Sequence, residues 1–417
     1  MIQYPKELDA IFNKLAINQL KPVIVGGYVR DSLLQIESKD IDIEVYGVNS
    51  FETLEKILYE FGSVNSVGKS FGVCKLSYKG YDLDFSLPRE DNKTASGHKG
   101  FKIITKVNIS YKDAAIRRDF TINSMGYDLI NKTLLDPFHG LEDLKNKTLN
   151  AVNEDTFVED PLRILRGVQF SARFGFEMSE KLLLLCTNMV KNHMLDELSH
   201  ERVYEEIKKL LLKSQTPSTG FTLLKRVGAL KYFSELDALD NNAYENTLKT
   251  LDAIKENKII LKLAALVYKL STPDAITFIT NLTNDKMLLT EILKITQNYQ
   301  MIEKIYENGV KDYDIYKLAT KATIEDLIYL SEAICIAEDT NCISVTMVKQ
   351  RAIELKVFTN KLTPILQGRD IIKFGIKPSK IFSQILDDAY ESQMNAKFSS
   401  YEEALFWLET HYAYLLS

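Results

Sequence analysis

Carboxylates alternate with apolar residues in the stretch KDIDIEVYG, residues 39–47, and this spacing could support metal chemistry. Side chains on a β-strand alternate between its two faces, so Asp40, Asp42 and Glu44 share one face of a predicted strand. Like charges this close repel one another and do not stabilise a strand. Two interpretations stay open for this stretch alone: a solvated edge strand, or a divalent metal held by Asp40 and Asp42. We expect Glu44 to be solvated.

The stretch GGYVRD, residues 26–31, follows the apolar run PVIV and opens a predicted helix. Gly26 and Gly27 would let the backbone come close to a ligand, and a helix N-terminus directs its amides at an anion. Arg30 would add a bidentate phosphate donor. The stretch is neither GxGxxG nor a P-loop, so neither standard nucleotide motif fits. The alternative is a tight strand–helix turn with a surface arginine.

The short distance between these two stretches links them. About ten residues separate GGYVRD from Asp40, which is enough for one short helix that returns the chain to an adjacent strand. The glycines and the acids would then lie at the same end of a sheet. In YDLDFSL, residues 81–87, Asp82 and Asp84 share a polar face, and Asp84 is a candidate third catalytic acid; an exposed sheet edge is the alternative. A triphosphate beside metal-binding carboxylates indicates phosphoryl chemistry by a two-metal route.

The elements that must position these residues change in type along the chain. Period-two patterns predict strands at 22–25, 41–47, 72–80, 81–87 and 101–108. Helical spacing predicts helices at 6–19, 28–36 and 51–62, and then almost only helices after about residue 155. We therefore expect an α/β head with a small mixed sheet, followed by an elongated all-α neck, body and tail. The predicted divisions are 1–137, 138–215, 216–320 and 321–417.

Composition excludes several classes of protein. The chain has 417 residues and a net charge of −5, so any nucleic-acid partner needs a local basic surface. Four scattered cysteines form no CxxC pair, and we expect reduced thiols without a disulfide or structural zinc. The N-terminus lacks the apolar segment of a secretory signal, and no run of about 18 apolar residues exists. We expect a cytoplasmic protein with no membrane partner.

Several motifs follow one another in the order of a known enzyme family. GGYVRD with KDIDIEV resembles the head of the DNA polymerase β-type nucleotidyltransferases, and more specifically the class II tRNA nucleotidyltransferases (CCA-adding enzymes) and bacterial poly(A) polymerases. The other matching stretches are VGKSFGVCK (67–75), REDNKTASGHKGF (89–101), RRDFTINSM (117–125), DPFHGLEDL (136–144), EDPLRILRGVQFSARFGF (159–176), SHERVYEEI (199–207) and LQGRDIIKFGIKPSKIFSQIL (366–386). The matches are dense over the first 210 residues and sparse afterwards.

The resemblance implies roles for individual residues. Asp40 and Asp42 would hold two Mg²⁺ ions, and Arg118 would join Gly26, Gly27 and Arg30 on the nucleotide phosphates. Asp160 and Arg163 would read the Watson–Crick edge of the incoming base, and Arg166 would face phosphate or base. An exposed helix in which Asp160 and Arg163 pair with each other is the alternative. Gln169 replaces a family arginine, which removes one positive charge. Arg117 is expected to pair with an acid, and Asn123 to pack locally.

Two outer segments carry further expectations from the resemblance. The loop 89–101 is expected to be a mobile surface loop, and in the family this loop is linked to the switch from CTP to ATP. In the tail, Lys373, Lys377 and Lys380 flank a helix start and would contact the backbone of tRNA; a charged surface turn is the alternative. No histidine is followed by Asp, so we expect no HD-type phosphohydrolase activity.

The sequence thus predicts an enzyme that adds CCA to the 3′ end of tRNA, with CTP and ATP as substrates and Mg²⁺ as cofactor. Within the class, the alternatives are an enzyme that adds only CC, one that adds only A, and a poly(A) polymerase. The loop 89–101 argues against the first, and the lack of a longer basic C-terminus argues against the third. Outside the class, the alternatives are a non-catalytic RNA-binding relative and a nucleotidyltransferase for small molecules.

Overall fold

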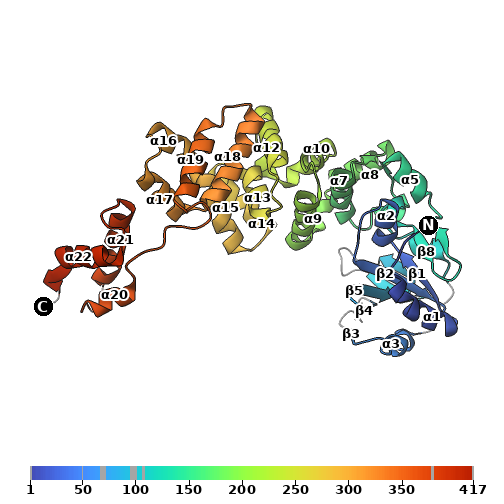
Figure 1. The fold of residues 1–417 in the computed structure, drawn as a ribbon. Helices are drawn as coiled ribbons and strands as arrows, with labels where there is room; N and C mark the ends of the chain where they lie inside the picture. The colour runs from blue at the N-terminus through green and yellow to red at the C-terminus, as the bar shows by residue number, and fades with distance from the viewer. Residues whose placement is uncertain are drawn as a thin grey trace. The chain divides into compact units, whose positions relative to one another are not determined.

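The computed structural model describes residues 2–48, 50–65, 72–93, 101–105, 109–376 and 380–415, with backbone alone for 90–93, 101–105 and 380. The chain divides into two compact units, Met1–Tyr232 and Phe233–Ser417. The first unit holds a sheet and the helices that follow it, and the second is helical in the described residues. The predicted α/β head followed by helices is therefore confirmed (Figure 1). The finer division into four segments stays a prediction.

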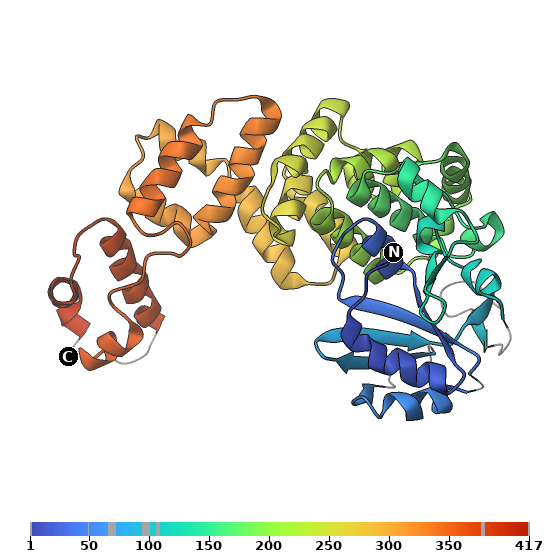
Figure 2. The same cartoon turned by 45° about the vertical axis from the view of Figure 1, so that its right-hand side comes forward.

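A seven-stranded mixed sheet forms the head in the described residues, with strand order β3-β4-β5-β2-β1-β8-β9. The two central strands, β2 and β5, run parallel, whereas β1 is antiparallel to both β2 and β8. Figure 2 shows the sheet from a second side, with helices packed along it. The strands are β1 (Lys21–Val25), β2 (Asp40–Tyr46), β3 (Val64–Asn65), β4 (Val73–Tyr78), β5 (Tyr81–Ser86), β8 (Gly126–Asp128) and β9 (Thr133–Leu135).

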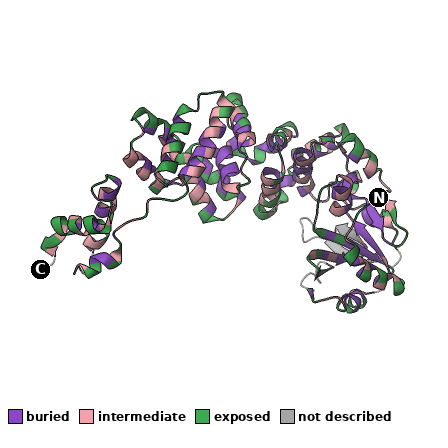
Figure 3. Cartoon of the chain, in the orientation of Figure 1, coloured by how far each residue is buried: buried purple, intermediate pink, exposed green. Residues whose placement is uncertain are grey.

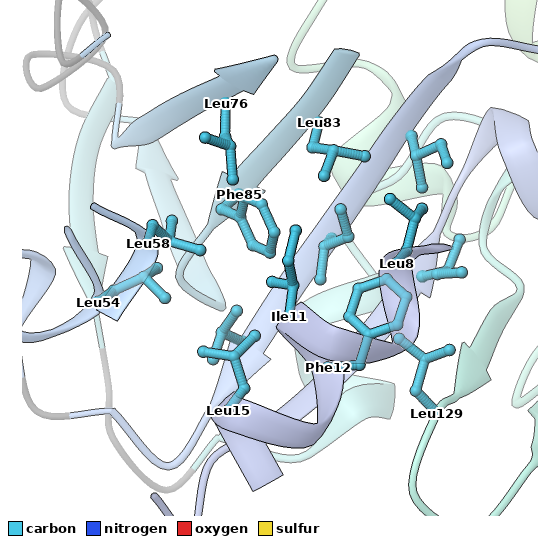
Figure 4. Packing of buried hydrophobic residues seen from close by; sticks show 14 of the residues in the cluster. Leu8, Ile11, Phe12, Leu15, Leu54, Leu58, Leu76, Leu83, Phe85 and Leu129 are labelled. Carbon is cyan, nitrogen blue, oxygen red and sulfur yellow. The ribbon is translucent and has the colours of Figure 1, made fainter. Parts of the chain in front are cut away.

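One face of this sheet is apolar and packs on two helices. Helix α1 (Asp9–Ile17) contributes Ile11 and Leu15, and helix α3 (Phe51–Leu58) contributes Leu54. Figure 4 shows these side chains meeting those of β4 and β5, and the cluster also contains Ile41 and Ile43 of β2. Burial of this face fixes the register of β2, so the even-numbered acids must face the other way.

A tight hairpin turn joins β4 to β5. Lys79 and Gly80 both have positive φ, 50° and 86°, as a two-residue turn with right-handed strand twist requires. The prediction for residues 89–108 was partly wrong, because Arg89–Lys93 (β6) and Phe101–Thr105 (β7) pair in a separate two-stranded sheet. The predicted mobile loop is thus a hairpin at its two ends, and residues 94–100 lie outside the described residues. The short strands β8 and β9 were not predicted.

The rest of the first unit is helical, apart from the short strands β10 (Thr148–Leu149) and β11 (Glu177–Met178). Helices α7 and α9 pack against each other, and α10 packs on α7. Ser179 caps α8 by accepting from the Leu182 amide, whereas Ser199 precedes α9 without such a bond. The helices are α2 (Gly27–Leu33), α4 (Tyr111–Ala115), α5 (Gly140–Asn146), α6 (Glu154–Phe157), α7 (Leu162–Phe174), α8 (Glu180–Lys191), α9 (His200–Lys213) and α10 (Ser218–Arg226).

The second unit consists of helices whose inner faces are apolar, which Figure 3 shows as buried residues on one side of each helix. A separate cluster of apolar residues, including Ile371, Ile385 and Leu408, joins its last three helices. No helix in the described residues has the length and hydropathy needed to cross a membrane. The α-helices of this unit in the described residues are α11 (Ser234–Asp237), α12 (Asn241–Ala253), α13 (Ile259–Val267), α14 (Thr272–Leu282), α15 (Lys286–Asn298), α16 (Met301–Glu307), α17 (Asp312–Lys321), α18 (Ile324–Glu338), α19 (Ile343–Glu354), α20 (Gly368–Lys373), α21 (Lys380–Met394) and α22 (Tyr401–Tyr412).

Candidate active site

Four carboxylates line one face of the sheet, at the start of the parallel strands β2 and β5. Asp40 lies directly opposite Asp82, and Asp42 lies directly opposite Asp84. Gly26 follows the end of the antiparallel neighbour β1, so it lies at the same end of the sheet. A Cβ atom on Gly26 would be 3.9 Å from Oδ2 of Asp42. The sequence prediction that the glycines and the acid pair share one end of the sheet is therefore confirmed.

The crowding of these carboxylates favours a divalent cation. Partial burial, together with the charges of Asp84, Glu44 and Asp40, raises the pKa of Asp42, and only the nearby Arg118 opposes this rise. Asp84 is partly neutralised by Lys75, whose Nζ lies 2.9 Å from its Oδ2. Asp40 and Asp42 both reach solvent, although protein atoms surround Asp42 closely. Exposed, mutually repelling carboxylate oxygens are the donors that Mg²⁺ prefers, so these residues fit the ion.

The number of protein ligands at this site is small. Within the described parts of the chain, no group of three or more His, Cys, Asp and Glu side chains is arranged to hold a metal. Mg²⁺ commonly takes one or two carboxylates and completes its shell with substrate phosphates and water. Asp40 and Asp42 suffice for such a site. A catalytic role for Asp84 stays a prediction, since its carboxylate already pairs with Lys75.

The expectation that Glu44 is solvated was wrong. Glu44 is 1% exposed, and its Oε1 accepts hydrogen bonds from Arg118 (2.8 Å) and Arg117 (3.2 Å). Its Oε2 accepts from the hydroxyl of Tyr46 at 2.9 Å. On β2, the part of the acidic face that holds Asp40 and Asp42 is open. The part that holds Glu44 is covered, because Tyr111 of α4 packs against Tyr46 there. The predicted pairing of Arg117 with an acid is confirmed.

Arg118 lies directly beneath the glycine turn. Its Nη1 would be 2.9 Å from a Cβ atom on Gly26, whose φ of +71° also favours glycine. Burial disfavours the charge of Arg118, but Glu44, Tyr111 and Asp42 act together against it and raise the pKa of the guanidinium above its ordinary value. Gly26 therefore leaves room for a charged arginine beside Asp42, which suits an anionic ligand next to a metal site.

Arg30 is an interior residue, so the alternative of a surface arginine was wrong, and its contact with phosphate stays a prediction. It is 4% exposed and bonds to Asp31, with Nε to Oδ1 at 2.8 Å, and to the amide oxygen of Asn123. Its guanidinium lies over the rings of Phe170 (5.1 Å) and Phe174 (4.8 Å). These contacts tie α2 to α7, so Arg30 holds the helix after the glycine turn against α7.

Asp119 and Arg166 form a second buried link between head and neck. Arg166 donates to Oδ2 of Asp119 from Nε at 2.7 Å and also lies near Glu206 of α9. Asp119 Oδ1 accepts from Asn123 at 2.9 Å, so the predicted local packing of Asn123 is confirmed. Burial alone would raise the pKa of Asp119, but Arg166 and Asn123 lower it below the ordinary value. Arg166 thus has its charge satisfied by protein groups.

Asp160 and Arg163 do not pair with each other, contrary to the alternative raised from the sequence. Asp160 accepts from Arg202 of α9 at 2.9 Å and caps the amide of Leu162. Arg163 donates to the main-chain carbonyls of Thr156 (2.7 Å) and Arg117 (2.5 Å). Arg202 was not singled out from the sequence, although it lies in the SHERVYEEI segment. Both side chains remain partly exposed beside the Arg117–Arg118 segment.

The remaining predicted site residues are less informative. Gln169 is 2% exposed, and its amide nitrogen has no hydrogen-bond partner among the described residues. Lys373 is exposed at the end of α20. Lys377 and the side chain of Lys380 lie outside the described residues. The tRNA contacts of these three lysines stay predictions.

A basic cleft of about 660 Å³ lies elsewhere in the neck, between the ends of α8 and α10. Four exposed cations line it: Lys191, Lys225, Arg226 and Lys231. Its one carboxylate, Asp196, accepts a hydrogen bond from Tyr232. Cations around an exposed aromatic ring form a surface suited to a phosphodiester backbone.

Two stretches of the chain match known protein families. Residues 23–150 match the family described as "Poly A polymerase head domain". Residues 175–239 match the family described as "Probable RNA and SrmB- binding site of polymerase A". The first unit therefore contains one segment similar to the poly(A) polymerase head domain, and the second match begins within the same unit.

Individual relatives narrow the class. The chain is 38% identical over 220 residues to the "Multifunctional CCA protein" of Pseudoalteromonas atlantica, which is 52% of this chain and 52% of that protein. It is 40% identical over 224 residues to the "CCA-adding enzyme" of Blochmanniella pennsylvanica, 53% of this chain and 52% of that protein. The chain thus matches about half the length of these curated relatives. Over that half, it is similar to proteins named as CCA-adding enzymes.

Solved structures extend the likeness of fold to nearly the whole chain. A CCA-adding enzyme in complex with CTP has a TM-score of 0.72 at 21% identity, over 98% of this chain and 96% of that one. The Thermotoga maritima CCA-adding enzyme complexed with tRNA has a TM-score of 0.68 at 20% identity, with the same coverage. The fold of both units is therefore that of CCA-adding enzymes.

Proposed function

We propose that this chain adds the 3′-terminal CCA sequence to tRNA, taking CTP and ATP as substrates. The single observation that supports this best is the convergence of Gly26, Asp42 and Arg118 at one end of the sheet, because a triphosphate needs a close backbone, a metal site and a cation together. The relatives that match the first half of the chain are named for the same activity. The free thiols of the chain suit the cytoplasm, where we place the reaction.

In this proposal the 3′-hydroxyl of tRNA attacks the α-phosphate of the nucleotide, and pyrophosphate leaves. Gly26 and Gly27 let the triphosphate approach the main chain, and Arg118 supplies a fixed positive charge below it. Asp40 and Asp42 would hold Mg²⁺, which when bound lowers the pKa of the hydroxyl and neutralises the leaving pyrophosphate. Positioning and electrostatic stabilisation account for most of the catalysis in such reactions.

We propose that Asp160 and Arg163 select the base, as the resemblance implies. A carboxylate and a guanidinium can together accept from an amino group and donate to a ring nitrogen, which cytosine and adenine both present. Arg202 holds Asp160, and two main-chain carbonyls hold Arg163. These contacts limit the rotamers of both side chains, so they would act as a fixed protein template. Each retains part of its surface for the base.

Single-nucleotide addition to three tRNA transcripts tests the function. The transcripts end in the discriminator base, in C and in CC, and each is incubated with Mg²⁺ and CTP, ATP or both. We expect all three to grow to the same CCA end and stop, as read on a sequencing gel. Extension of the CC transcript alone would indicate an A-adding enzyme. If CTP extends the shorter transcripts to CC and ATP adds nothing to any transcript, the result would indicate a CC-adding enzyme. Long ATP ladders would indicate a poly(A) polymerase, and no extension would overturn the proposal.

The basic cleft of the neck gives a second test of RNA binding. Replacing Lys191 and Arg226 together by Ala should weaken tRNA binding about tenfold near 0.1 M salt, because two phosphate contacts are lost. The slope of log affinity against log salt should fall by roughly two units. Fluorescence anisotropy of labelled tRNA at several salt concentrations measures both quantities.

A matched double variant separates this effect from a general loss of charge. Lys145 and Lys213 are also exposed and also lie in the last turns of helices, α5 and α9, but outside the cleft. Their replacement by Ala removes the same charge and should leave tRNA affinity within about twofold, a typical size for surface electrostatic effects. An equal loss in both double variants would show that the cleft has no special role.

A further inference from the structure

Glu44 lies beneath the proposed phosphate site without reaching it. All three of its recorded hydrogen bonds come from protein groups: Arg118, Arg117 and the Tyr46 hydroxyl. It is 1% exposed, so it does not contact solvent or substrate directly. One carboxylate therefore accepts hydrogen bonds from two guanidinium groups.

Arg118 connects this buried carboxylate to the glycine turn. Its Nη2 lies 2.8 Å from Oε1 of Glu44, while its Nη1 lies 2.9 Å from the position of a Cβ on Gly26. Glu44 thus fixes one end of the planar guanidinium and leaves the other end below the turn. A planar group held at one edge has a defined orientation at the other.

We propose that Glu44 is a positioning residue that fixes Arg118 under the nucleotide phosphates and partly neutralises its charge. This inference rests on the proposed function, since it takes Arg118 to contact the triphosphate. The orientation aids binding of the nucleotide. The partial neutralisation weakens the hold on phosphate, and thereby allows pyrophosphate to leave after each addition.

Two substitutions separate the effect of the charge of Glu44 from the effect of the length of its side chain. Glu44→Gln keeps the shape and an acceptor for Arg118 but removes the negative charge. We expect it to lower the KM for CTP and strengthen inhibition by pyrophosphate, each about fivefold, the size of one screened charge interaction. Glu44→Asp keeps the charge but shortens the side chain by one methylene, so Arg118 loses its orientation. We expect it to raise the KM for CTP by a similar factor.

Steady-state kinetics of CTP addition to a tRNA transcript, with a pyrophosphate inhibition series, measures these effects on the full chain. Opposite changes of KM in the two variants support the proposal. A purely structural role for Glu44 would lower the melting temperature of both variants and leave KM and the pyrophosphate inhibition constant of the folded enzyme unchanged, which would overturn it. If the unmodified chain does not extend tRNA at all, the proposed function fails instead, so the two failures are distinguishable.

Discussion

Replacing Asp42 by Asn is expected to lower nucleotidyl transfer about a thousandfold, which corresponds to roughly 4 kcal/mol of transition-state stabilisation. Asn keeps the size of the side chain but removes one of the two charges that would hold Mg²⁺. The same change relieves repulsion from Asp84, Glu44 and Asp40, which raise the pKa of Asp42. We therefore expect the melting temperature to stay constant or rise slightly while activity is lost. Single-turnover CTP addition and thermal unfolding measure the two effects.

Asp82 provides the matched control for this prediction. It lies on the same face of β5, two residues before Asp84, and accepts a hydrogen bond from Ser77. Asp82→Asn removes one charge from the same carboxylate face but leaves Asp40 and Asp42 intact. Activity should then fall by only a few fold. Near-normal transfer by Asp42→Asn, or an equal loss in the two variants, would rule out the assigned metal site.

Replacing Asp119 by Ala is expected to lower the free energy of unfolding of the first unit by about 3 kcal/mol. The variant leaves the guanidinium of Arg166, the side-chain amide of Asn123 and the main-chain amide of Phe120 without their acceptor. Loss of an acceptor for a buried donor costs more than the bond itself contributes. Asp119→Asn keeps one acceptor oxygen and should lose less.

The single tryptophan of the chain makes this prediction measurable. Trp407 lies in the second unit, so its fluorescence reports that unit, whereas far-ultraviolet circular dichroism reports both. In urea titrations we expect Asp119→Ala to shift the dichroism transition and leave the tryptophan transition in place. An unchanged dichroism curve would show that the buried link between Asp119 and Arg166 does not stabilise the first unit.

The stability difference between the parent chain and Asp119→Ala depends on pH in a direction that follows from the lowered pKa of Asp119. The folded-state pKa of Asp119 is lowered, so its stabilising effect is fully present above the ordinary carboxyl value of about 3.9. The effect is lost only as the pH falls through the lower, folded-state value. The difference in stability between the parent chain and Asp119→Ala should therefore be constant from pH 7 to about pH 5 and shrink below about pH 4.

The sequence was sufficient to predict which residues meet at the proposed catalytic end of the sheet, because period-two alternation is a strong local signal. Ile41 and Ile43 had to face the core, so Asp40 and Asp42 had to face outward, and the short gap after Gly27 left few topologies. Glu44 was misjudged because alternation gives the face of a residue but not what covers that face. Here Tyr111, more than sixty residues later, covers the part of the face that holds Glu44.

Arg30 is a second residue whose surroundings could not be predicted from a local sequence pattern. Its position in the first turn of a helix suggested a phosphate donor or a surface arginine, but Phe170 and Phe174 of α7 enclose it. Asp31 and Asn123 make this burial tolerable, because a buried guanidinium needs hydrogen-bond acceptors. Such long-range partners are absent from any local pattern. The short strands β8 and β9 escaped prediction for a similar reason, since three residues are too few to display alternation.

The parallel pairing of β2 with β5 also has a consequence for how the head folds. Asp40 with Asp82 and Asp42 with Asp84 repel each other across the two strands, while Ile41 with Leu83 and Ile43 with Phe85 attract each other on the opposite face. A slip of either strand by one residue would turn its acids into the apolar core, where burying an unpaired charge costs several kcal/mol. The acids thus disfavour any shifted register of the two strands. The residues proposed to bind Mg²⁺ therefore also help to select the correct alignment of the sheet.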